Sequence, residues 1–339
     1  MVVRTGEDTS ARSRGPSPQT FFLSWGILLG VLLLAFGATV FTLNQTLYSA
    51  SGFASSYLDA LKRHDLDGAL AMPGVEAQGD AATALLVPEA MGTLTSYSLV
   101  SDEDQGAGMH LLAFDVVFAG DVEAEAEFMV ERAGARLGLF VDWRFAQSPL
   151  RTLEITPLHD AEFDVNGVTI VGPNGSNQPY RFQVLTPGFF TLSHESKYLV
   201  AQPVKVVAST SLEVTAVAVD IQASAAFVDQ VTVELSDYLD ECTTQQVLQP
   251  SNCPFGQTMN NRIEGLPAWS MAVYPVISIL PGDEPGSWLV PQTPAAAHLT
   301  VEVRSLFDGS LSTFDEDVPF TIEYLITFPG DGSLLITPR

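Results

Sequence analysis

The sequence has little positive charge. Of its 339 residues only 15 are Lys or Arg, and three of these are Lys, whereas 40 are Asp or Glu, giving a formal net charge of −25. Such a surface repels phosphate backbones and anionic lipid head groups, so nucleic-acid binding and basic membrane patches are excluded. Scarce Lys beside abundant Ala, Val and Gly is typical of a GC-rich genome, such as that of an actinobacterium.

Cysteine is also scarce, and the only two residues are Cys242 and Cys253, on either side of the polar stretch TTQQVLQPSN. An even count predicts one disulfide if the compartment is oxidising. A loop this short would contribute about 2–3 kcal/mol of stability. The alternative, a two-cysteine metal site, lacks histidines at ligand spacing.

Catalytic motifs are missing. The sequence contains no H-E-x-x-H, G-x-S-x-G, P-loop or G-x-G-x-x-G pattern. Four of its five histidines are scattered without mutual spacing: His64, His159, His194 and His298. We therefore predict no catalytic residue, no metal site and no cofactor.

One long stretch lacks charge altogether: Phe21–Leu43, FFLSWGILLGVLLLAFGATVFTL. As a helix it would extend roughly 34 Å, enough to cross a hydrocarbon core of roughly 30 Å with some tilt. The alternative is a cleaved signal peptide, but those have shorter apolar regions, and Ser49-Ala50-Ser51 is a poor cleavage site several residues beyond this one. We therefore predict an uncleaved transmembrane helix.

The flanking charges predict the orientation of this helix. Three arginines precede it, at Arg4, Arg12 and Arg14, whereas Asn44–Tyr57 contains neither Lys nor Arg. Because positive residues stay in the cytoplasm, the N-terminus is expected inside and the rest of the chain outside the cell membrane. The tail, residues 1–20, is too short and polar to form a core and is expected to be disordered.

The first exterior segment, residues 44–149, combines a helix with strands. Apolar residues recur at helical spacing in Ser49–Leu70, and a period of two follows in four segments: Tyr97–Ser101, Met109–Phe118, Asp121–Glu131 and Leu137–Phe145. An antiparallel meander with one apolar face, covered by the opening helix, is the natural arrangement. The phrase from Ala54 to Leu70, A-x-x-Y-L-D-A-L-x-x-x-D-x-x-G-A-L, and the meander after it resemble the NTF2-like (cystatin-like) domains of exported bacterial proteins.

The next segment, residues 150–210, is expected to be a small all-β module. An Asn166-Gly167 turn divides two short strand pieces, and further strands are expected at Tyr180–Leu185, Phe189–Ser193 and Val204–Ala208. The sequence V-N-G … V-L-T-P-G-F-F-T-L is similar to PEGA-like surface modules. Both resemblances imply fold rather than activity, because such modules serve many functions.

The last segment, residues 211–339, repeats the order of helix and strands. A strand at Leu212–Ile221 leads into Ala223–Glu241, whose apolar stripe favours a helix although its Val-rich middle is also compatible with a strand. Strands are then expected at Ala268–Leu280, His298–Phe307, Val318–Phe328 and Leu334–Thr337. Pro275 should place the first of these at an edge or a bulge. The predicted class is α+β, with a second NTF2-like domain after the β module.

Four titratable residues of the first segment are candidates for binding a ligand. Asp115, Asp142 and Arg144 face away from the apolar side of their strands, and would form a polar pocket if the interior of the cone lay on that side. The alternative is that they form the solvated back of the sheet. His110 shares the face of Leu112 and Phe114, where a histidine can be an acid or base or simply a packing residue.

Three functions remain open. The first is a membrane-anchored, non-enzymatic protein of the cell envelope that binds a protein, a wall polymer or a small ligand. The second is a spacer or assembly subunit that holds a partner at a set distance from the membrane. The third is an enzyme that uses the mouth of the first cone, with Asp115, Asp142 or His110 as acid or base.

Overall fold

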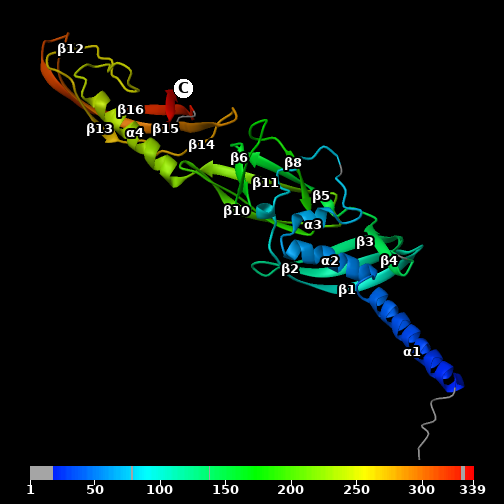
Figure 1. Cartoon of the computed structure of the whole chain (residues 1–339). Coiled ribbons are helices and arrows are strands. Elements are labelled where there is room, and N and C mark those ends of the chain that lie inside the picture. The colour runs from blue at the N-terminus through cyan, green and yellow to red at the C-terminus, as the bar shows by residue number, and fades with distance from the viewer. Residues whose placement is uncertain (1–17, 78, 137, 330–332) are drawn as a thin grey trace, which may run out of the picture.

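The computed structural model describes residues 18–77, 79–136, 138–329 and 333–339. It begins with α1 (Pro18–Gln45), of which Trp25–Gln45 is long and apolar enough to span a membrane, and none of that stretch is buried in the protein. In Figure 1 this helix projects from one end of an elongated molecule. Most of the tail predicted to be disordered, residues 1–17, lies outside the described residues.

The first module joins three short helical segments to a four-stranded sheet. The segments are α2 (Ala50–Lys62), α3 (Leu66–Leu70) and the 3₁₀ turn η1 (Pro88–Ala90). The strands run antiparallel in the order of the chain: β1 (Leu94–Gly106), β2 (Met109–Phe118), β3 (Val122–Arg136) and β4 (Phe140–Phe145). Ser49 begins α2 because its Oγ accepts the N–H of Gly52 at 3.0 Å. The predicted meander is confirmed, and the helix expected in Ser49–Leu70 is divided into α2 and α3 on either side of His64, whose φ is positive.

The middle sheet has seven strands: β5 (Leu150–Leu158), β6 (Glu162–Val165), β7 (Val168–Val171), β8 (Tyr180–Leu185), β9 (Gly188–Glu195), β10 (Leu199–Ala208) and β11 (Val214–Ala223). Their order is β7-β6-β9-β10-β11-β5-β8. The Asn166-Gly167 turn has positive φ at both residues, as its hairpin requires. The sheet does not stop at the expected border at residue 210, because β11 pairs antiparallel with β10 and parallel with β5.

The distal module contains α4 (Ala225–Thr243) and a six-stranded sheet. Its strands are β12 (Arg262–Ile263), β13 (Ala268–Val273), β14 (Leu280–Pro281), β15 (Ser287–Arg304), β16 (Leu311–Thr327) and β17 (Leu335–Pro338). The strand expected over Ala268–Leu280 is instead two strands, since Pro275 has no N–H for pairing and both pieces lie along β15. The hairpin of β15 and β16 is roughly 60 Å long at the usual rise per residue.

The disulfide ties the end of α4 to the loop that follows it. Cys242 and Cys253 are bonded, and their Cα atoms are 5.8 Å apart. The prediction of a disulfide is therefore confirmed. The helix prediction for Ala223–Glu241 is also confirmed, because Phe227, Val231 and Leu235 form its buried face.

Buried contacts continue through both joints between the three parts. At the first joint, the Tyr57 hydroxyl donates to the Thr186 carbonyl at 2.9 Å, and Leu185 and Phe189 of the middle sheet belong to the core of the first module. At the second joint, the middle sheet and the distal module share one hydrophobic core. The modules therefore follow one another as a rod without a flexible linker, as Figure 1 shows.

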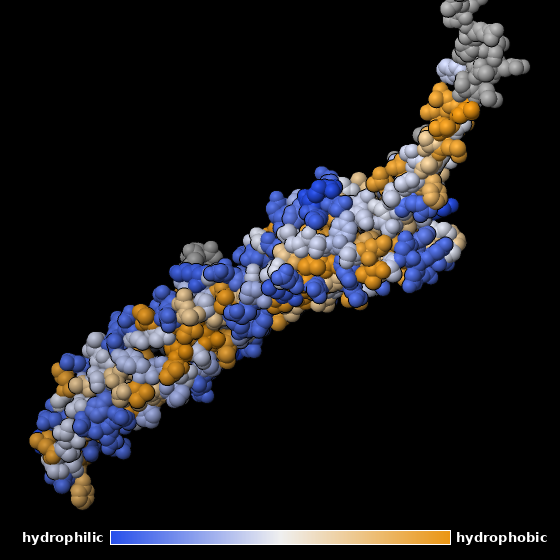
Figure 2. Space-filling model, turned by 90° about the horizontal axis from the view of Figure 1, so that it is seen from below, coloured by the Kyte–Doolittle hydropathy of each residue, from blue (hydrophilic) through white to orange (hydrophobic). Residues whose placement is uncertain are grey.

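The surface differs sharply between the helix and the body. Figure 2 shows apolar side chains gathered on α1, whereas the face of the body in view is mostly hydrophilic with scattered apolar residues. This division agrees with a helix that contacts lipid and a body that is exposed to water.

Candidate functional site

The interior of the first sheet is filled by aromatic side chains. Tyr57 from α2 is fully buried and lies 5.7 Å from Phe128 and 5.2 Å from Phe145 between ring centroids, and Phe114 lies 5.9 Å from Phe128. Burial raises the pKa of the Tyr57 phenol, so this hydroxyl remains a donor. A hollow on the apolar side, lined by Leu61, Phe118 and Phe190 among others, has a volume of only ≈ 20 Å³. That is no room for an organic ligand.

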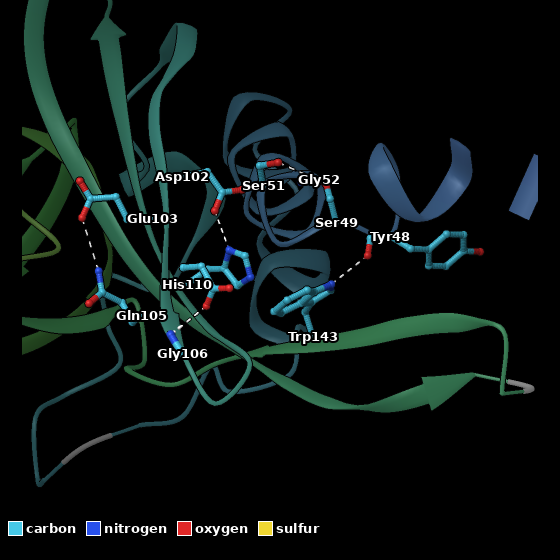
Figure 3. Close-up of polar contacts among 11 residues, drawn as sticks. Tyr48, Ser49, Ser51, Gly52, Asp102, Glu103, Gln105, Gly106, His110 and Trp143 are labelled. Atoms are coloured by element: carbon cyan, nitrogen blue, oxygen red, sulfur yellow. Dashed lines mark hydrogen bonds and ion pairs between the residues drawn. The ribbon is translucent and has the colours of Figure 1, made fainter. Parts of the chain in front are cut away.

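His110 lies at the rim of this interior, between Asp102 and Trp143 (Figure 3). Its Nδ1 is 2.6 Å from Oδ1 of Asp102, and its ring lies edge-on to Trp143 at 5.1 Å between centroids. Trp143 in turn donates its indole N–H to the Tyr48 carbonyl at 2.8 Å. The contact with Asp102 is of a kind that can orient an imidazole for proton transfer, whereas the T-shaped contact with the Trp143 indole is one of packing, so both roles expected of His110 remain predictions.

Asp115 lies on the solvated back of the sheet. In the strand register it stands opposite Ser98 on β1 and Glu125 on β3. These residues, with Glu123, line a shallow surface groove of ≈ 460 Å³. The groove is acidic and open, which suits solvation better than selective binding.

Asp142 and Arg144 lie on β4, away from Asp115. Arg144 Nε donates to Oε1 of Glu131 at 2.6 Å, and Asp142 stands opposite Gly134. Along β3, the partners of Asp115 and Arg144 are six residues apart, which is roughly 20 Å. The structure thus does not bring Asp115, Asp142 and Arg144 into one polar cluster.

The most charged hollow lies where the first module meets the middle sheet. It has a volume of ≈ 490 Å³ and is lined by the side chains of Arg144, Arg151, Glu131 and Glu213, among others. Arg151 is fixed in place, because its guanidinium donates twice to the Thr210 carbonyl, at 3.3 and 3.1 Å. We call this hollow the joint groove. Its mixed charges suit a small polar ligand that carries both signs.

No group of three or more His, Cys, Asp or Glu side chains is placed to hold a metal ion in the part of the chain that the structure describes. Three of the four glutamates of β3, Glu123, Glu125 and Glu127, are exposed to solvent. Calcium needs six or more oxygens from a curved loop, which a single straight strand does not supply.

Arg151 and Glu213 are among the residues of the joint groove that sequence reasoning missed. They come from β5 and from the link before β11, which are some 60 residues apart in the chain yet adjacent in the sheet. No local pattern marks a parallel pairing of such distant strands. The partner of His110 was missed for a similar reason, since Asp102 lies across a hairpin whose register is irregular.

No protein-family model, characterised protein or solved structure matches this chain. What is shown is therefore a mixed α+β fold with one N-terminal apolar helix, several sheets and a disulfide.

Proposed function

We propose that this chain is a single-pass, membrane-anchored protein of the cell envelope, with its N-terminus in the cytoplasm and its modules outside. It acts without catalysis, as a rigid arm that holds a binding surface for a protein or wall polymer at a set distance from the membrane. In this proposal the arm consists of an NTF2-like module at each end and a PEGA-like module between them. These assignments rest on the resemblances in the sequence.

The observation that carries the proposal is the continuity of buried packing along the rod. Phe227 of α4 is fully buried at the second joint, 5.3 Å from Tyr198, 6.1 Å from Trp288 and 5.4 Å from Phe328 between ring centroids. At the first joint, Asn166 donates Nδ2 to the Ala90 carbonyl at 2.8 Å, and Ala82 pairs with Phe182 at the edge of the middle sheet. Domains joined by linkers lack such shared cores and move against one another.

Placement outside the cytoplasm has two supports. Trp25–Gln45 is long and apolar enough to cross a bilayer, and its described side chains are mostly exposed, as expected of a helix that contacts lipid. The disulfide between Cys242 and Cys253 indicates an oxidising compartment.

The far end of the arm offers a surface for a protein partner. In the turn between β15 and β16, the Ser305 hydroxyl accepts the N–H groups of Phe307 and Asp308, at 3.2 and 3.4 Å. This ordered turn leaves Phe307 fully exposed and Leu306 72 % exposed. Beside the turn, Arg304 donates to Glu264 and to the Gly309 carbonyl, so the two apolar side chains are the main feature of this end, and the matching partner would have an apolar pocket.

The joint groove favours a second candidate function, the binding of a small ligand. Purification in mild detergent distinguishes the two. A partner that co-purifies with the wild-type chain, and is lost from a Phe307→Ser variant that still folds, supports the arm. A lone chain with a molecule in the groove supports ligand binding and contradicts the arm.

The membrane placement is tested by adding protease to intact cells that express the full chain. The proposal expects digestion of the modules while the α1 segment stays with the membrane fraction. Full protection of the modules in intact cells, with digestion only after lysis, would show that they lie in the cytoplasm and would overturn the proposal.

A further inference from the structure

The end of α1 continues into a partly aromatic surface on the first module, next to Arg136, which stands opposite Phe140 in the register. We call this surface the collar and define it by four residues: Leu47 and Tyr48 after α1, Leu139 just before β4, and Phe140 at the start of β4. No charged residue occurs from Trp25 to Leu58, and the collar adds none. Leu47 is 70 % exposed and Leu139 is 42 % exposed, so both leucines of the collar present apolar surface.

Asn44, in the last turn of α1, holds the two halves of the collar together. Its Nδ2 donates to the Leu139 carbonyl at 2.8 Å, and its Oδ1 accepts the N–H of Val141 at 3.2 Å. These two bonds bracket Phe140, whose ring stacks on Tyr48 with 4.5 Å between centroids. Leu139 and Phe140 are thus held at the same level as the end of the apolar helix.

If α1 spans a bilayer, that level is where the hydrocarbon core gives way to the head groups. Aromatic side chains concentrate there in membrane proteins, because their rings are apolar at one end and polar at the other. The Trp143 indole lies just behind the collar and holds Tyr48 through its carbonyl, as Figure 3 shows. The collar therefore has both the composition and the position of an interfacial belt.

We propose that the collar is a second membrane contact, seated in the head-group layer of the bilayer that α1 crosses. The contact rests on the proposed function, since it requires α1 to span the membrane. It deepens that function, because two points of attachment fix the tilt of the first module and so the direction of the whole arm. The collar needs no anionic lipid, which agrees with the acidity of the body.

The test uses spin labels on the full chain in nanodiscs of phosphatidylcholine. Single thiols are introduced by Leu139→Cys in the collar, Leu33→Cys inside α1, and Leu280→Cys in the distal module, where the native leucine is 49 % exposed. Collisions with oxygen report lipid, and collisions with a water-soluble nickel chelate report water. We expect oxygen to dominate at positions 33 and 139, and the nickel chelate to dominate at position 280.

The possible failures are distinguishable. If position 33 is in lipid while position 139 is as accessible to nickel as position 280, the collar proposal is overturned and the anchor stands. If position 33 is also in water, both are overturned.

A matched pair of variants tests the role of Asn44. Asn44→Ala removes both bonds to the turn, whereas Gln45→Ala changes its exposed neighbour. The label at position 139 should become more mobile and more accessible to nickel with Asn44→Ala but not with Gln45→Ala. Identical spectra for the two variants would show that Asn44 does not hold the collar in the membrane.

Discussion

At the scale of single residues, Tyr57 connects the first module to the middle sheet. Its hydroxyl is the buried donor to the Thr186 carbonyl. Tyr57→Phe keeps the ring but leaves this carbonyl without that donor, so the free energy of unfolding should fall by about 1–3 kcal/mol. Denaturant titration measures the change, with Tyr274→Phe as control. Tyr274 is 43 % exposed, so water can replace its bond to Asp240, and an equal loss in both variants would contradict the structural role of Tyr57.

His298 gives the distal module a dependence on pH. Hydrogen bonds to the carboxylates of Asp317 and Asp315 raise the pKa of its imidazole above the ordinary value of 6.5. Because the folded pKa is the higher one, this stabilisation is complete below about pH 6.5 and is lost as the pH rises through the raised pKa. An NMR titration should place the midpoint of His298 above 6.5.

The same titration supplies its own control. Asp317→Asn removes the first of the two carboxylates and should lower the midpoint, whereas Asp283→Asn, at an exposed carboxylate that pairs with Arg339, should not. A wild-type midpoint at or below 6.5 would show that the two carboxylates do not hold the imidazolium.

At the scale of elements, α4 supplies the buried ring of Phe227 to the second joint. Phe227→Ala removes the ring that contacts Tyr198, Trp288 and Phe328, and a change of this kind in a filled core costs about 3–5 kcal/mol. Val233→Ala on the same helix is the matched control, since Val233 is 56 % exposed and should change stability by less than about 0.5 kcal/mol. Calorimetry on both variants measures the difference. Similar values would mean that the joint is not packed as described.

The disulfide stabilises the distal module at the end of α4. Reduction of the bond between Cys242 and Cys253 frees the loop after α4 and should lower the stability of the distal module by about 2–3 kcal/mol. Thermal unfolding with and without reductant measures this, with mass spectrometry to confirm that the thiols are free. An unchanged melting temperature in fully reduced protein would contradict the prediction.

The elements were predictable from the sequence where one face is buried and the other is wet. The stripe of Phe227, Val231 and Leu235 predicts α4, and the alternation in β2 places His110 on the buried side. Such patterns report burial of one face, which is a local property. They do not report which strands pair, so neither the parallel pairing of β11 with β5 nor the joint groove could be foreseen.

At the scale of the whole molecule, the three parts form a rod because their hydrophobic cores include residues from both sides of each joint. The apolar face of α4 packs against the residues around Tyr198, so the second joint is buried within one hydrophobic core. Predicted borders at residues 149 and 210 follow changes in sequence pattern. The packing instead crosses such borders, since Leu150, Leu185 and Phe189 pack into the first module.

The most direct test of the rigid arm is a pair of spin-label distances across its two joints, measured on the full chain in nanodiscs. Exposed positions serve as label sites: Val100 on β1 with Val171 on β7 across the first joint, and Val171 with Val276, between β13 and β14, across the second. A rigid arm predicts one narrow distance distribution for each pair, and a broader one across the second joint in Phe227→Ala. Broad or multiple distances in the wild-type chain would show that the modules move independently, and would contradict the arm.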